Sequence, residues 1–337
     1  MRFIGVDLHT NSLTVCYLSA EGEEQLVTYK LSELSVFVAR LQADDQVAVE
    51  ATGNTRYFVG QIQAQVAQVV VVNPSQFEVI RRSVKKTDKN DARSLAFFLS
   101  KGMLPTARLK DERSAQMNSL AQTRDKFVKL RTTLINKMHA IHNTHGIKSV
   151  KSAFKSEKGL QAALAREWGE VVRIELEVLA GQIRSLNDGL KKLDGQMEKS
   201  GQEMPGHANL TSIKGIGAKS AAILLSVIGN IADFASEKKL ESYFGVVPKV
   251  SNSNETLNHG RITKRGSKLG RTTLVQCTLI AIKYSPYLRK FYDRKKAQKG
   301  AGKAIIATAR KFLGIIYHTL KNNWVFEDFP NFVLAKS

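Results

Sequence analysis

Two apolar runs that each end in a single acid constrain the fold of this chain more than any other feature. Phe3–Val6 leads into Asp7, and Val47–Val49 leads into Glu50. Short apolar runs of this kind are typical of buried strands. We therefore expect both carboxylates at strand ends, where they meet the edge of a sheet.

A second acidic feature is the pair Asp88 and Asp91, in a segment expected to be a helix over 75–104. Their spacing of three places both on one helix face. Alone, they also fit a solvated helix with charge pairs. Four carboxylates gathered with Asp7 and Glu50 would repel one another unless a divalent cation lay among them, so we predict a Mg²⁺ site, with Mn²⁺ as the alternative. Basic residues frame the pair: Arg81, Arg82, Lys85, Lys86, Lys89 and Arg93.

The order of elements around these acids predicts an α/β domain of the ribonuclease-H (RuvC-like) type over residues 1–105. Ser32 is a plausible N-cap for the first helix, and Pro74 stops the last strand. Strands are expected at 2–9, 13–19, 25–30, 47–50 and 69–72, and helices at 32–41 and 55–66.

The charge of the chain points to a polyanionic partner. Lys and Arg number 51 against 30 Asp and Glu, which gives a formal net charge of +21. Nucleic acid is the expected partner, with a membrane surface as the competing one. No apolar run of about 18 residues, signal pattern or lipidation motif is present, so we expect a cytoplasmic, nucleoid-associated protein without membrane contact.

Cysteine and histidine usage argues against a disulfide and against zinc. Cys16 and Cys277 lie far apart in apolar contexts, so we expect buried free thiols. His139, His142 and His145 recur every three residues in a basic helix, but no companion cysteines give a zinc-binding spacing.

Residues 106–200 are expected to form a helical arm. Apolar residues recur at helical spacing from about Asp111 to Lys199, with a break in the glycine-, lysine- and serine-rich region 146–159. This pattern predicts two long helices in an antiparallel, coiled-coil-like pair. Such an arm favours dimerisation, and its basic first helix also suits a phosphate backbone.

Residues 201–337 are expected to be mainly helical and to open with a helix-hairpin-helix. The turn Gly215-Ile216-Gly217 is flanked by Lys214 and Lys219. Glycines let backbone amides approach a phosphate at a helix N-terminus. The alternative is a tight helical hairpin used only for packing.

A polar loop rich in Ser and Asn is expected over 245–266, and it contains Ser251 and Ser253. A hydroxyl beside several cations suits a nucleophile for phosphoryl transfer, although turn composition alone also explains a serine here. Arg271 should open a long helix to about Ile282. A basic tract at 289–303 then favours contact with a nucleic-acid backbone over reading of bases. The cations near the loop are Arg261, Lys264, Arg265 and Arg271.

With these motifs in order, the chain resembles the DEDD transposases of insertion-sequence family 110 (1111 group), which includes the Piv pilin-gene invertase. The resemblance covers nearly the whole chain. It rests on Gly5-Val6-Asp7, Glu50-Ala51-Thr52-Gly53, Asn73-Pro74, Lys86-Thr87-Asp88 with Asp91-Ala92, Ile213-Lys214-Gly215-Ile216-Gly217, Phe244-Gly245-Val246-Val247-Pro248 and Gly260-Arg261-Ile262-Thr263-Lys264-Arg265-Gly266.

The resemblance implies that Asp7, Glu50, Asp88 and Asp91 bind magnesium, and that a C-terminal transposase domain supplies a nucleophilic serine. Counting from Pro248, that serine is Ser253, with Ser251 in reserve, because the family usually has Ser-Gly where this chain has Ser253-Asn254. It also implies a bridge (seeker) RNA that pairs with donor and target DNA, although the related invertases are described without one.

These inferences predict a site-specific DNA recombinase that works as a homodimer, or as a tetramer when two DNA sites are joined. The enzyme alternative is a RuvC-type junction nuclease that forms no covalent intermediate. The other alternative is a non-catalytic nucleic-acid-binding protein, which the paired acids argue against, because carboxylates repel phosphates.

Overall fold

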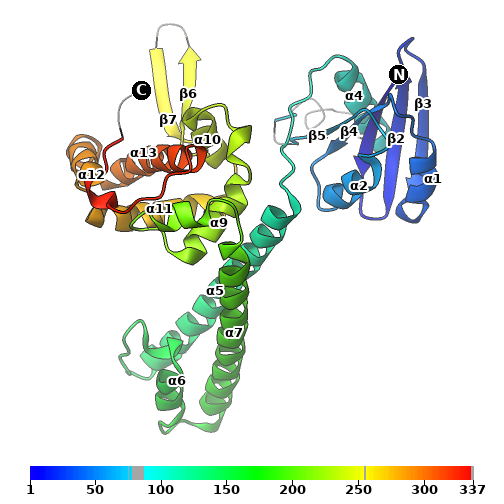
Figure 1. Ribbon diagram of the computed structural model, residues 1–337. Coiled ribbons are helices and arrows are strands. Elements are labelled where there is room, and N and C mark those ends of the chain that lie inside the picture. Colours follow the sequence, from blue (N-terminus) through cyan, green and yellow to red (C-terminus); the bar gives the residue numbers. More distant parts are fainter. Residues whose placement is uncertain (75, 78–86, 254–255, 335–337) are drawn as a thin grey trace. The chain divides into compact units, whose positions relative to one another are not determined.

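The computed structural model describes residues 1–74, 76–77, 87–253 and 256–334 (Figure 1). The chain divides into two compact units, Met1–Leu109 and Lys110–Ser337.

A five-stranded sheet forms the framework of the first unit. Its strands are β1 (Arg2–Leu8), β2 (Ser12–Ser19), β3 (Glu24–Lys30), β4 (Gln46–Glu50) and β5 (Gln68–Val72), in the order β3-β2-β1-β4-β5. The first three strands pair antiparallel, whereas β1 with β4 and β4 with β5 pair parallel. The mixed α/β architecture expected from the order of elements is therefore confirmed.

Helices cover both faces of this sheet (Figure 1). On one face, α1 (Leu34–Ala39) and α2 (Thr55–Ile62) share a buried apolar cluster with alternate residues of the strands. On the other face, α4 (Asp88–Ser100) buries Leu95 and Leu99 against β4 and β5. Because successive strand residues face opposite sides, this alternation decides which acids can meet.

Gly5 lets α4 approach β1 closely. A Cβ atom at this position would lie 2.0 Å from the carbonyl oxygen of Ala92 and 2.5 Å from the amide nitrogen of Ala96. Backbone atoms cannot move aside as side chains can, so only glycine fits here. The contact fixes α4 against the middle of β1 and brings the first turn of the helix toward the end of that strand.

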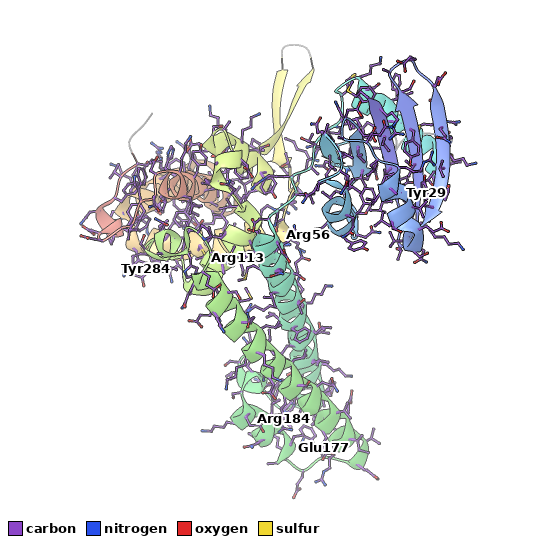
Figure 2. All side chains as sticks on the ribbon, turned by 45° about the vertical axis from the view of Figure 1, so that its right-hand side comes forward. Tyr29, Arg56, Arg113, Glu177, Arg184 and Tyr284 are labelled. Atoms are coloured by element: carbon purple, nitrogen blue, oxygen red, sulfur yellow. The ribbon has the colours of Figure 1, made fainter. Side chains whose placement is uncertain are left out.

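Two long antiparallel helices dominate the start of the second unit. Cross-contacts set their direction: Arg124 binds Asp194 near one end, and Lys137 binds Glu175 near the other. The helices are α5 (Glu112–Thr144) and α7 (Glu170–Gln202), and between them the chain forms η2 (Ala153–Lys155) and α6 (Glu157–Leu164). Arg184 of α7, labelled in Figure 2, holds α6 through an ion pair of 2.7 Å with Glu157.

The remainder of the second unit is a helical bundle with one two-stranded ribbon. Phe244, Leu274, Phe312 and Phe329 are buried in its core, together with Met197 of α7. The elements are α8 (His207–Thr211), α9 (Ala218–Ile228), η3 (Ile231–Asp233), α10 (Glu237–Phe244), β6 (Pro248–Ser253), β7 (Thr256–Ile262), α11 (Lys268–Tyr284), α12 (Pro286–Lys299), α13 (Ala301–Lys321) and η4 (Phe329–Asn331).

The structure corrects the loop expected over 245–266. Residues 248–253 and 256–262 pair as antiparallel strands β6 and β7. The Ser- and Asn-rich composition suggested a turn, but the β-branched residues Val250, Thr256 and Ile262 favour extended backbone. Ladder hydrogen bonds between the two segments then outweigh the local preference.

Helix boundaries in the first unit also differ from expectation. The chain already turns at Leu31–Glu33 as the 3-10 helix η1, so Ser32 is not an N-cap. Glu33 explains this early turn, because its carboxylate accepts the backbone N–H of Lys30 at 2.9 Å. The helix expected over 75–104 is described from Asp88 to Ser100, and residues 75 and 78–86 lie outside the described part of the chain. The helix expected over 55–66 ends at Ile62.

Both cysteines are buried and free, as predicted. None of the helices formed by the described residues is long and apolar enough to cross a membrane.

Candidate active site at the end of the sheet

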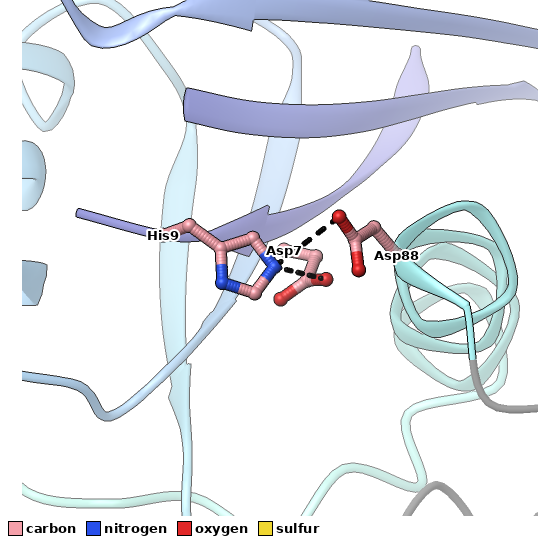
Figure 3. Close-up of side chains that lie close together, drawn as sticks. All are labelled: Asp7, His9 and Asp88. Carbon is pink, nitrogen blue, oxygen red and sulfur yellow. Dashed lines mark hydrogen bonds and ion pairs between the residues drawn. The ribbon is translucent and has the colours of Figure 1, made fainter. Parts of the chain in front are cut away.

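Asp7, His9 and Asp88 meet where β1 ends (Figure 3). Nε2 of His9 lies 3.1 Å from Oδ2 of Asp7 and 3.4 Å from Oδ2 of Asp88. One potential ligand atom from each of the three side chains lies within 4.8 Å of the others. Two carboxylate oxygens at this separation fit the coordination of a divalent cation.

Local structure explains the position of Asp88. It is the first residue of α4, and the hydroxyl of Thr87 caps the helix by accepting the N–H of Asn90 at 3.3 Å. A carboxylate in the first turn is stabilised by the helix dipole. Asp91 lies in the same turn, so the helix N-terminus and the end of β1 bring acids from distant parts of the sequence to one place.

Glu50 is the last residue of β4, beside β1. Val6 pairs with Val49, and both valines belong to the core on the α1 and α2 side. The next residues, Asp7 and Glu50, therefore face the α4 side of the sheet. The hydroxyl of Thr55 donates to the carbonyl oxygen of Glu50 at 2.7 Å and fixes the chain beyond the strand.

Electrostatics at this site oppose the ionisation of Asp7. Burial is the main cause that raises its pKa, and the carboxylates of Asp88 and Asp91 raise it further, while His9 lowers it. Asp91 lies with Asp88 in the first turn of α4, so both carboxylates act on Asp7 from the same end of the helix. A bound cation would remove the repulsion among these acids.

Sequence reasoning did not select His9. Its signal was its position two residues after Asp7, at the start of the turn into β2, but a lone histidine carries little information. The turn is held by Asn54, whose side-chain amide donates to the carbonyl oxygen of His9 at 2.8 Å. Only packing reveals that the imidazole reaches Asp88 as well as Asp7.

The two candidate serines lie in β6. Ser253, the last residue of the strand, is paired with Thr256, and Ser251 with Asn258. They belong to the second compact unit, whereas the four acids belong to the first.

The predicted hairpin motif lies between α8 and α9. Gly215 has a positive φ of 114°, and a Cβ there would come within 2.7 Å of the backbone nitrogen of Ala281 in α11, so packing alone explains this glycine. Gly217 precedes α9 and has open space around it. Lys214 is exposed, whereas Lys219 forms an ion pair of 2.9 Å with Asp194.

Arg261, Lys264 and Arg265 are exposed around the turn between β7 and α11. Arg271 has a different environment. Its Nη1 donates to the carbonyl oxygens of Phe244, Arg265 and Gly266 at 3.1–3.2 Å, and burial lowers its pKa. Arg271 therefore holds the turn that presents the three exposed cations.

Two protein-family models match parts of this chain. A DEDD-type family model described as "Transposase" matches residues 4–145, which include all four acids. A second model, described as "Transposase IS116/IS110/IS902 family", matches residues 207–293, which include both candidate serines.

Similar curated proteins span nearly the full length of the chain. The transposase for insertion sequence element IS1111A of Coxiella burnetii is 23% identical over 95% of this chain and 90% of its own length. The pilin gene-inverting protein of Moraxella bovis is 26% identical over 96% and 97%, respectively. The transposase for IS1328 of Yersinia enterocolitica is 25% identical over 85% and 86%.

Proposed function

Because this chain belongs to the IS110 family of DEDD transposases, we propose that it is a site-specific recombinase that cuts and rejoins DNA through a nucleophilic serine and a Mg²⁺-dependent acidic site. The observation that carries the proposal is the meeting of Asp7 and Asp88 at the end of a sheet whose neighbouring strand ends in Glu50. The strand order and the family match support a RuvC-like catalytic domain.

The donor set suits a hard divalent cation. Asp7, Glu50, Asp88 and Asp91 offer carboxylate oxygens, which Mg²⁺ and Mn²⁺ prefer, and His9 adds a nitrogen that suits Mn²⁺ better than Mg²⁺. When bound, the cation would stabilise negative charge on the phosphate undergoing transfer. The largely buried Asp7 would hold it from the strand, and the exposed Asp88 from the helix.

Ser253 is the proposed nucleophile, with Ser251 in reserve. Its Oγ would form a bond to phosphorus as the bond from phosphorus to one deoxyribose oxygen breaks, and the hydroxyl proton would pass to solvent or a nearby base. The resulting phosphoserine keeps the energy of the phosphodiester for rejoining. Ser253 and the acids must reach the same phosphate, and a second copy of the chain could supply either.

Two substitutions test the reaction. Asp7→Asn and, separately, Ser253→Ala should each abolish strand exchange on a DNA substrate that carries both recombination sites, while Ser251→Ala keeps activity. Denaturing gels of wild-type reactions should contain a covalent protein–DNA adduct that Ser253→Ala lacks. Cleavage by Ser253→Ala with no adduct in the wild type would instead support a junction nuclease. Binding without any strand breakage in Mg²⁺ would support a non-catalytic protein.

We propose a catalytic domain at 1–105, a dimerisation arm at 106–200 and a transposase domain at 201–337, acting on DNA in the bacterial cytoplasm. Nucleic-acid contacts are proposed at Lys214, Gly215, Gly217, Lys219, Arg261, Lys264, Arg265 and Arg271; the packing of Gly215 and the internal bonds of Lys219 and Arg271 give these three the weakest support.

A guide RNA is proposed from kinship alone. Sequencing the RNA that co-purifies with the protein from its native host should recover one transcript from the flank of the encoding element. Recovery of only abundant cellular RNA would contradict RNA guidance and leave the proposed DNA chemistry untouched.

A further inference from the structure

Helices α12 and α13 line an open basic hollow of about 370 Å³ that the proposed reaction does not use. Gly300 joins the two helices, and Ala304 and Ala307 line the hollow with small side chains. Lys295 and Lys299 reach it from α12, one turn apart, and Lys303, Arg310 and Lys311 reach it from α13.

The lining carries far more positive than negative charge. Five basic side chains face one acid, Glu241, which gives a formal net charge of +4. The carboxylate of Glu241 is already paired with Arg310, because its Oε2 accepts two hydrogen bonds from that side chain at 2.6 and 3.1 Å. Among the described residues, none of the four lysines has an ion-pair partner. Like charges so close together repel one another until an anion joins them.

Aromatic rings hold part of this charge in place. The ammonium group of Lys311 lies 4.5 Å from the ring centroid of Tyr287 and 5.0 Å from that of Phe291. Lys295 lies 5.9 Å from the same Phe291 ring. These cation–π contacts stabilise the ammonium groups and limit the freedom that binding would otherwise remove. Because cations already contact Phe291, the hollow is better suited to phosphates than to stacked bases.

The structure divides the basic tract at 289–303 into two sets. Lys295, Lys299 and Lys303 line the hollow, whereas Lys290 and Lys296 are exposed and lie outside its lining. The sequence pattern alone does not distinguish the lysines of one set from those of the other. Lys295 and Lys299 are four residues apart and share one face of α12, a face that Lys290 and Lys296 do not share. Lys303 reaches the hollow from α13.

We propose that this hollow binds consecutive phosphates of the DNA substrate, without reading its sequence. The choice of DNA over RNA follows from the transposase family. The inference rests on the DNA-recombinase function but not on Ser253 or the four acids, so a binding measurement separates its failure from failure of the proposed chemistry.

The test compares two charge-matched variants of the full chain. One combines Lys295→Gln with Lys303→Gln in the hollow, and the other combines Lys290→Gln with Lys296→Gln outside it. The dissociation constant for a short DNA duplex of arbitrary sequence is measured over a range of salt concentrations. Each lost phosphate contact should reduce the slope of log K against log salt by about 0.9, so the hollow variant should lose about two units of slope.

The control variant should keep a slope close to that of the wild type, since it removes the same charge without removing a phosphate contact. Scrambling the duplex sequence should leave the difference between the variants unchanged. Equal slopes for the two variants would overturn the proposal, as would a loss confined to one DNA sequence or to single-stranded RNA. Thermal unfolding of both variants checks that each is folded, so a change in slope reports binding and not loss of structure.

Discussion

The carboxyl group of Asp7 lies in surroundings that oppose its ionisation. Its side chain is only 15% exposed, and the charges of Asp88 and Asp91 act on it together with burial to raise its pKa. Such a residue costs stability in the absence of a cation. This cost is expected at a site arranged for binding and not for folding.

The sign of the pH effect follows from this shift. Below the ordinary pKa of an aspartic acid, Asp7 is protonated in both the folded and unfolded states and contributes nothing. As pH rises, the unfolded state ionises first, so the folded state loses stability relative to it until the raised folded-state pKa is passed.

Asp7→Asn should therefore raise the melting temperature of the metal-free protein at pH 7, and the gain should vanish near pH 3. Thermal unfolding in EDTA across this range measures it. Adding Mg²⁺ should stabilise the wild type more than the variant. A variant that melts below the wild type at pH 7 would contradict the assigned electrostatics.

At the scale of elements, the contact between α4 and β1 positions the acidic site. Gly5 allows the helix backbone to lie directly on the strand. Any side chain at this position would push α4 away, and Asp88 would then move away from Asp7. The close packing of the domain and the geometry of the site therefore depend on the same residue.

Gly5→Ala should destabilise the protein by about 1–3 kcal/mol, because the added methyl group overlaps backbone atoms. Gly60→Ala is the matched control. Gly60 is exposed in α2 and a Cβ there meets nothing within 4 Å, so alanine should stabilise by about 0.5–1 kcal/mol. Urea unfolding measures both, and Mn²⁺ titration should detect weaker binding only in Gly5→Ala. Equal stability of the two variants would refute the proposed contact.

At the scale of the whole molecule, α7 carries an apolar stripe that none of the described residues covers. Val171, Ile174 and Val178 are 80%, 55% and 60% exposed and recur at helical spacing along one face. Such a stripe supports the proposed use of the arm in dimerisation, because a second copy would remove these side chains from water.

Val171→Glu combined with Val178→Glu should weaken the homodimer at least about tenfold, since each carboxylate would have to enter an apolar contact. Sedimentation velocity over a range of concentrations measures the dimer. Val325→Glu, at another exposed valine of the same unit, should leave it unchanged. A wild-type protein that stays monomeric at every concentration would refute this role of the arm.

The sequence by itself determined the elements of the first unit and the order of its acids. Apolar runs with a single terminal acid define strands locally, and the spacing of Asp88 and Asp91 needs only a helix. The prediction of a loop was wrong for residues 248–253 and 256–262, because pairing between these segments outweighs the turn preference of Ser and Asn.

Only the tertiary structure decided which side chains meet. The approach of His9 to Asp88 depends on α4 lying against Gly5, and no local pattern encodes that contact. No local pattern encodes the hydrogen bonds of Arg271 to the turn carbonyls either. Nor does one encode which lysines of α12 and α13 line the hollow. Secondary structure follows from short-range periodicity, whereas a site forms where packing brings distant side chains together.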